Sequence, residues 1–248
     1  AGLTAILFVA AIFAFLLRDS MPIFAKYPLR ELLSGTRWAP TSDPERFGML
    51  PLMLGSLYVT LGAMVIAVPL GLATAVFIAE VAPKPAQEFL KPTVEMLAAV
   101  PSVVYGFLGL LLVGPWLADV MDLPVGRFAG VGALILAFMA MPTIVSVSED
   151  AIRAVPVALR ENSLALGATR WQTIVRVVLP AGRSGIIASI MLGLGRAIGE
   201  TMTVLMVTGN AAVIPTSLFQ PVRTMTATIA SEMGEVAQGT PHYHALFA

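Results

Sequence analysis

Long apolar runs without a charged residue dominate the chain and alternate with shorter polar segments. Five such runs predict helices at about 1–17, 54–79, 96–117, 128–147 and 184–207. Each run is long enough to cross a bilayer as a helix, which needs about 20 predominantly apolar residues. No ten-residue stretch alternates apolar and polar positions as a membrane-spanning strand would. The pattern therefore predicts an all-α, polytopic bundle of transmembrane helices.

The two ends of the sequence affect how many spans we expect. The first run could be a signal peptide, but its apolar stretch is long and no A-x-A site precedes the charged residues, so an uncleaved span is favoured. The sequence does not begin with methionine, and its closing string HALFA is typical of the opening of a sixth span. We expect six spans, the last one cut off. Residues 1–50 would hold the first span and its extracytoplasmic loop, and residues 51–248 the core.

Composition agrees with a membrane protein. Hydrophobic residues make up 57% of the 248 positions and charged residues 12%, whereas soluble domains run near 45–50% apolar and about 25% charged. The net charge of zero indicates no bulk attraction to nucleic acid. The absence of cysteine excludes thiol catalysis and disulfides. Lys and Arg divide equally between the two sides of the predicted bundle, so the positive-inside rule does not orient it.

The polar segment 149–183 carries the most informative pattern. Pro156 opens a short helical stretch, Gly167 interrupts it, and a second helical stretch runs to Pro180. Leucines on this segment would be exposed outside the bilayer, and exposed apolar side chains of this kind fit a groove on another protein. We expect the segment to be a docking surface.

The same segment resembles the cytoplasmic loop of ABC-importer permeases, whose pattern is E-A-A, three residues, Gly, nine residues, Ile, one residue and Leu-Pro. The matching positions are Glu161, Gly167, Val177, Leu179 and Pro180. Asn162 and Ser163 replace the two alanines, and Val177 replaces isoleucine. The resemblance implies a MetI-like fold with a cytoplasmic amino terminus. It also implies that segment 149–183, here called the docking loop, meets an ATPase through Glu161, Ala165, Gly167, Leu179 and Pro180.

The chain has no nucleotide-binding motif of its own. The pattern G-x-x-x-x-G-K-[ST] does not occur. ATP and Mg²⁺ would therefore be bound by two partner ATPase subunits, and this chain would hold no cofactor and act as a transport subunit rather than an enzyme.

Two ionisable residues lie inside the fifth predicted span. A lone charge near the bilayer centre costs about 2.5–3.5 kcal/mol on insertion scales. Arg196 and Glu200 are four residues apart, so on a continuous helix they share a face and can pair. One interpretation is a self-neutralising structural pair. The other is that the Arg196 guanidinium, a planar fork of donors, meets an anionic substrate such as phosphate.

Several strings resemble the phosphate-specific transport permeases of the PstC type, among them GLGRAIGETMTVLMVTGN, AVPLGLATAVFIAE, PSVVYG and RTMTATIASEMGE. The resemblance covers most of residues 47–248. It implies a substrate path that includes Arg196, Glu200, Thr201 and Ser102. It implies as partners a homologous PstA-type permease subunit, the two ATPase subunits and a periplasmic phosphate-binding protein, in the bacterial cytoplasmic membrane.

Three alternatives remain at this point. The same machine could carry another oxyanion such as sulfate or molybdate, the chain could be a passive anion channel, or it could be a membrane-embedded enzyme. His242 and His244 are two residues apart, which does not favour a metal site, and we expect them at the surface. Glu80, Glu95 and Glu149 lie at the ends of spans and are interpreted as ordinary interfacial charges.

Overall fold

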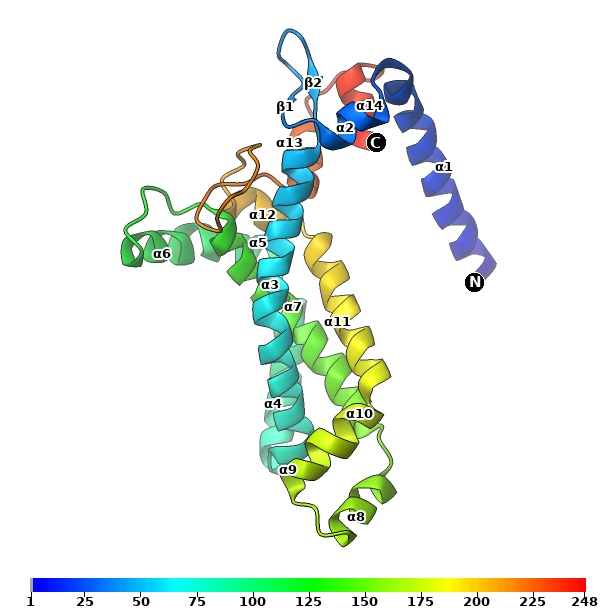
Figure 1. Ribbon diagram of the computed structural model, residues 1–248, viewed down its shortest axis with the longest axis vertical. Helices are drawn as coiled ribbons and strands as arrows, with labels where there is room; N and C mark the ends of the chain where they lie inside the picture. The colour runs from blue at the N-terminus through cyan, green and yellow to red at the C-terminus, as the bar shows by residue number, and fades with distance from the viewer. Residues whose placement is uncertain (1) are drawn as a thin grey trace.

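The chain is mostly helical (Figure 1). This computed structural model describes residues 2–248. The helices are α1 Gly2–Lys26, α2 Leu29–Ser34, α3 Leu50–Val76, α4 Lys84–Ala99, α5 Ser102–Leu108, α6 Gly114–Val120, α7 Ala129–Arg153, α8 Val157–Ala165, α9 Arg170–Thr173, α10 Leu179–Ala181, α11 Arg183–Ile198, α12 Met202–Val207, α13 Met225–Glu232 and α14 Pro241–Phe247. Three π-helical stretches continue α3, α5 and α9: η1 Phe77–Val81, η2 Gly109–Val113 and η3 Ile174–Val178. A two-stranded antiparallel hairpin, β1 Trp38–Ala39 and β2 Arg46–Phe47, pairs Trp38 with Phe47.

The predicted all-α bundle of membrane spans is confirmed. Four helical segments are long and apolar enough to cross a membrane: Gly2–Lys26, Leu50–Val81, Ser102–Val120 and Ala129–Arg153. The pair Arg170–Ala181 and Arg183–Ile198, bent by 71°, is a fifth candidate. Residue 1, the start of the first predicted helix, lies outside the described residues.

Two predicted spans are wrong in detail because each contains a break. The third was predicted to run unbroken from 96 to 117, but α4 ends at Ala99 and α5 begins at Ser102. Pro101 forces Val100 into an extended conformation, with φ −64° and ψ 129°. The fifth was predicted from 184 to 207, but α11 ends at Ile198 and α12 begins only at Met202.

Close packing of α3, α7 and α11 forms the core of the bundle (Figure 1). On α11, Gly185, Ser189, Gly193 and Ala197 recur every four residues, so they form one stripe of small side chains. This stripe faces α7: the Ser189 hydroxyl bonds to that of Ser148 at 2.6 Å, and Gly193 lies against Ile144. Small residues permit such close approach of membrane helices, where dispersion contacts supply most of the attraction.

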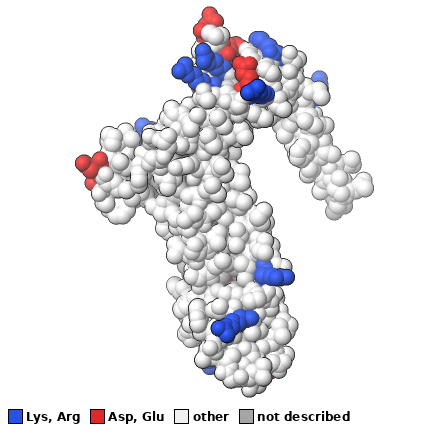
Figure 2. Space-filling view, in the orientation of Figure 1, with Lys and Arg blue, Asp and Glu red and all other residues white. Residues whose placement is uncertain are grey.

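Charged side chains gather at the two ends of the molecule (Figure 2). In the view shown they surround the β-hairpin at one end and the docking loop at the other, with a further acidic group at the tip beside α6. Most of the long surface between them is uncharged, as the hydrocarbon core of a bilayer requires. Segments 27–49 and 208–248, here called the cap, therefore lie across the membrane from the docking loop.

Helix α1 stands apart from the other spans (Figure 1). None of its most apolar window is buried, and it contacts α14 at its cap end, where Phe15 meets Phe247 edge to face at 5.7 Å. An apolar helix this exposed is stable in lipid or against another membrane helix, and not in water.

The α7–α11 contact yields a prediction with a matched control. A Cβ on Gly193 would lie 2.6 Å from Ile144 Cγ1, whereas a Cβ on Gly195 would meet nothing within 4 Å. Gly193→Ala should lower the free energy of unfolding by about 1–3 kcal/mol through overpacking. Gly195→Ala should be neutral or slightly stabilising, because alanine has the better helix propensity. Thermal denaturation in detergent measures both, and equal stability of the two variants would contradict this packing.

Candidate functional site

The two helix breaks lie against each other inside the membrane part of the bundle. One break, at residues 100–101, separates α4 from α5, and the other, at residues 199–201, separates α11 from α12. The hydroxyl of Thr203 on α12 donates to the Ser102 carbonyl at 2.9 Å, which joins the two breaks directly. Irregular backbone at membrane depth is tolerated only where protein buries it or where it lines a cavity. At these breaks the backbone is satisfied by protein groups.

Further hydrogen bonds satisfy backbone groups that the breaks leave open. The Tyr105 hydroxyl donates to the Leu97 carbonyl at 3.0 Å, and the Thr226 hydroxyl of α13 donates to the Glu200 carbonyl at 2.7 Å. An unpaired carbonyl in a low-dielectric setting would cost about 1–3 kcal/mol. These bonds make each break a stable part of the fold.

Arg196 lies one turn before the second break and reaches the first. Its guanidinium donates to the Ala98 carbonyl in the last turn of α4 and to the Thr143 hydroxyl of α7, both at 3.3 Å. The last turn of a helix carries partial negative charge, which favours a cation there. Arg196 thereby connects α4, α7 and α11.

The guanidinium keeps spare capacity for a ligand. Of its five N–H donors, two are used by these bonds within residues 2–248, and no carboxylate in that range pairs with it. A cation within a membrane domain ordinarily pairs with a counter-charge or faces a pathway. Free guanidinium donors at a helix break can bind an oxyanion by two parallel hydrogen bonds.

The predicted pairing of Arg196 with Glu200 is wrong. The Glu200 carboxylate instead accepts from the backbone N–H groups of Thr201 and Thr203, at 3.1 and 3.3 Å. The prediction assumed a continuous helix, but α11 ends before Glu200, so the two side chains no longer share a face. Glu200 satisfies open N–H groups at the start of α12, where a negative charge is favourable.

Ser102 and Thr201, which we predicted to line the path, lie at the two helix breaks. Ser102 is the first residue of α5, and its carbonyl receives the bond from Thr203. Thr201 precedes α12 and donates through its hydroxyl to the Gly199 carbonyl at 3.3 Å. Both residues are partly accessible. Their role in binding substrate stays a prediction.

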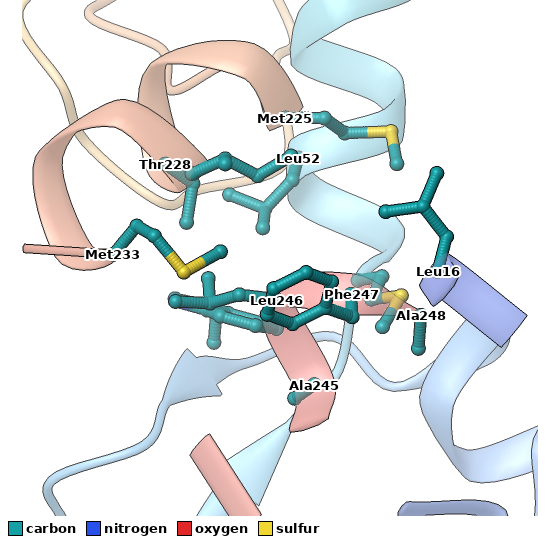
Figure 3. A pocket seen from close by; sticks show the side chains of 12 residues that line it. Leu16, Leu52, Met225, Thr228, Met233, Ala245, Leu246, Phe247 and Ala248 are labelled. Carbon is teal, nitrogen blue, oxygen red and sulfur yellow. The ribbon is translucent and has the colours of Figure 1, made fainter. Parts of the chain in front are cut away.

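An apolar pocket lies at the cap, away from the two breaks. Figure 3 shows side chains of α1, α3, α13 and α14 around it, including Leu16, Leu52, Met225 and Leu246. No charged residue lines it. It can hold an apolar group and is unsuited to an anion.

The docking loop folds into short helices around a glycine bend. Gly167 has φ +84°, in the region that favours glycine, and a capping box between Thr169 and Gln172 starts the next helix. Leu166 and Trp171 are 89% and 65% exposed. Of the predicted docking residues, Glu161, Ala165, Gly167 and Pro180 are exposed and Leu179 is half-buried. The loop thus presents an apolar surface to a partner, although its contact with an ATPase stays a prediction.

Two charges that we interpreted as interfacial are integrated into the fold. Glu149 is 1% exposed and is paired with Lys91 of α4 at 2.7 Å and with Arg153. Hydrogen bonds to Glu149 and then to Asp150 raise the pKa of Lys91, so this lysine stays charged at neutral pH. Glu80 pairs with Arg160 of the docking loop at 2.8 Å. The i,i+4 spacing of Glu149 and Arg153 is visible in the sequence, but no local spacing signals the other two pairs, whose partners are 58 and 80 residues apart.

His242, expected at the surface, is partly exposed and belongs to a polar cluster. Its side chain is 15% exposed and bonds to Glu232 at 2.8 Å, beside Arg223 and Trp38, which bond to the same carboxylate. Within residues 2–248, no group of three or more His, Asp or Glu side chains is placed to hold a metal ion.

Broken spans, a mid-membrane arginine and an external docking loop define a membrane permease subunit. A family model for binding-protein-dependent transport system inner membrane components matches residues 67–232, and the chain belongs to this family. The chain is therefore a multi-pass inner-membrane transport subunit, as predicted, and not itself an enzyme.

Individual relatives match over most of the chain. It is 39% identical over its whole length to the probable ABC transporter permease protein YqgH of Bacillus subtilis, of which it covers 78%. It is 39% identical to the phosphate transport system permease protein PstC of Mesorhizobium japonicum, over 82% of this chain and 67% of that protein. It is 37% identical to PstC of Pasteurella multocida, over 81% of this chain and 68% of that protein.

The separation of Arg196 from Glu200 is testable by a double-mutant cycle. Arg196→Gln and Glu200→Gln should show a coupling free energy below about 1 kcal/mol, because they share no ion pair. The matched control is Lys91→Gln with Glu149→Gln, which removes a real pair and should show a larger coupling, up to about 3 kcal/mol. Thermal denaturation of the purified chain in detergent provides the free energy of unfolding of the four members of each cycle: the unmodified chain, the two single variants and the double variant. A coupling at Arg196 and Glu200 as large as the control's would contradict the geometry described above.

Proposed function

We propose that this chain is one of two permease subunits of an ATP-driven importer that moves inorganic phosphate across the bacterial inner membrane. The observation that carries this proposal is the 36–39% identity to phosphate transport system permeases over most of the chain. The site supports it chemically, because Arg196 has unused donors and no acidic partner within the described residues. A guanidinium of this kind suits a tetrahedral oxyanion.

The proposed complex needs partners that supply energy and substrate. A homologous PstA-type subunit would complete the path, and two ATPase subunits would bind ATP and Mg²⁺ and dock on the apolar surface of the docking loop. A periplasmic phosphate-binding protein would deliver phosphate at the cap. ATP-driven closure of the ATPases would move the docking loops and switch the path between inward-open and outward-open states, as alternating access requires.

The other functions considered from the sequence are less well supported. A passive channel has no use for an exposed docking loop, and an embedded enzyme needs a nucleophile with a base, which the two helix breaks do not present. Sulfate or molybdate carriage would use the same chemistry at Arg196. The relatives named for phosphate transport favour phosphate over these oxyanions.

Uptake by the reconstituted complex tests the proposed substrate. Vesicles holding the complex should take up labelled phosphate only with ATP and the binding protein, and should not take up sulfate or molybdate. Arg196→Gln should lower uptake about 100-fold at matched complex levels, because it removes charge-assisted hydrogen bonds worth about 1.5–3 kcal/mol. Arg196→Lys keeps the charge but loses the planar fork of donors, so its phosphate uptake should lie between that of the unmodified complex and that of Arg196→Gln. ATP-independent uptake, or a preference for sulfate, would contradict the proposal.

Gly167 tests the role of the docking loop. Its φ of +84° costs a leucine roughly 1–2 kcal/mol, while a Cβ there meets nothing within 4 Å, so backbone strain is the expected effect. Gly167→Leu should distort the loop and lower phosphate uptake per ATP hydrolysed, with the chain still in the membrane. Gly167→Asn is the matched control, since asparagine tolerates positive φ. If Gly167→Leu takes up as much phosphate per ATP hydrolysed as the unmodified complex, the bend is not needed for docking.

A further inference from the structure

Arg160 of the docking loop connects helix α8 to the ends of two spans. Its guanidinium donates twice to Glu80 Oε1, at 2.8 and 3.2 Å, and so reaches η1 at the end of α3. It also donates to the carbonyl of Ile152, at 2.8 Å, and to that of Val155. These two carbonyls lie in the last turn of α7 and just beyond it. One side chain thus bonds to α3 and α7 together.

This position suits an arginine for two reasons. The last carbonyls of a helix have no partner within the helix, and the helix dipole places partial negative charge there. The side chains of Arg160 and Glu80 are 19% and 14% exposed, so salt screens their interaction less than it screens a surface pair. A lysine could keep the charge but could not reproduce this fork of bonds.

Helix α8 is joined to α7 by a three-residue connection and packs against η3, but it has no buried face of its own. It buries none of its nine residues, and its apolar side chains, including Val157 and Leu164, are exposed. The bond between the Ser163 and Thr173 hydroxyls joins α8 to α9 and stays within the docking loop. A displacement of α8 would reach α7 through the short connecting segment and α11 through η3, whereas Arg160 is the residue of α8 that bonds to η1 at the end of α3.

The two spans that Arg160 holds also lead to the helix breaks. Helices α3 and α7 pack along their lengths, and Thr143 of α7 contacts Arg196. Because packed helices move as rigid bodies, a shift at the cytoplasmic end of α7 is transmitted to that contact.

We propose that Arg160 is a positioning residue that fastens the docking helix α8 to α3 and α7, so that movement of the docking loop displaces both spans together. The inference rests on the proposed function, since it takes the docking loop to be the surface that an ATPase moves. Arg160 lies on the inner side of α8 and need not touch the ATPase itself. Removing it should uncouple transport from hydrolysis and leave docking intact.

The first test compares transport with ATP hydrolysis in the reconstituted complex. Arg160→Gln should lower phosphate transported per ATP hydrolysed about tenfold, within the usual range of coupling effects, while hydrolysis continues. Glu80→Gln should lower this ratio less than Arg160→Gln does. Arg160→Lys should keep part of the coupling that Arg160→Gln loses. Lys84→Gln is the matched control, because Lys84 is an exposed cation at the start of α4 and lies outside the docking loop. An unchanged ratio in Arg160→Gln, or an equal drop in Lys84→Gln, would overturn the proposal.

A second measurement needs no substrate. The chain has no cysteine, so Ala158→Cys on α8 and Leu70→Cys on α3 can carry two spin labels in the assembled complex. In the unmodified complex, the distribution of distances between the two labels should be narrow with and without ATP. In Arg160→Gln this distribution should broaden clearly. Arg160→Lys replaces that variant if it does not assemble. An unchanged distribution would overturn the proposal. Failure of the parent complex to take up phosphate would count against the proposed substrate alone, because the distances would still decide the role of Arg160.

Discussion

A backbone N–H or carbonyl in the bilayer core has no water to bond to, and this constraint governs the rest of the structure. It allows helices to cross the membrane and forbids irregular backbone unless protein satisfies it. The helices are nevertheless interrupted at residues 100–101 and 199–201, where α4 meets α5 and α11 meets α12. The fold meets the constraint by placing the breaks together, where Thr203 bonds to the carbonyl of Ser102. The broken segments can therefore form a polar site deep within an apolar bundle.

Charge is distributed according to the same constraint. Arg196 lies at the negative end of α4 and Glu200 at the positive end of α12, so helix termini take part of the role that a counter-ion would have. Because the two side chains do not neutralise each other, the guanidinium retains donors for an anion. A salt bridge between them would have occupied guanidinium donors that are now unused.

Apolar packing and ionic bonds stabilise different parts of the bundle. The small-residue stripe of α11 brings it close to α7, with the Ser148–Ser189 hydrogen bond inside the contact. At the docking-loop end the links are ionic instead, with Lys91 and Glu149 joining α4 to α7, and Arg160 and Glu80 joining α8 to η1. Tight apolar packing gives rigid spans, and directional ionic bonds attach a small exposed helix that has no buried face of its own.

The sequence by itself determined the class of fold, the order of the apolar spans, and the pattern of short helices around a glycine bend in segment 149–183. Those features depend on local composition and spacing: apolar runs of membrane length, and Glu161, Gly167 and Leu179–Pro180 in register. The sequence also singled out Arg196, because a charge inside an apolar run is visible without any tertiary information. Its expected partner was wrong, since charge spacing alone does not reveal that a helix ends at Ile198.

Only the tertiary structure decided that Arg196 meets Ala98 and Thr143, that Glu149 is buried, and that Arg160 reaches Glu80. These contacts join residues 53 to 98 positions apart, and their geometry depends on how whole helices pack, which no local pattern encodes.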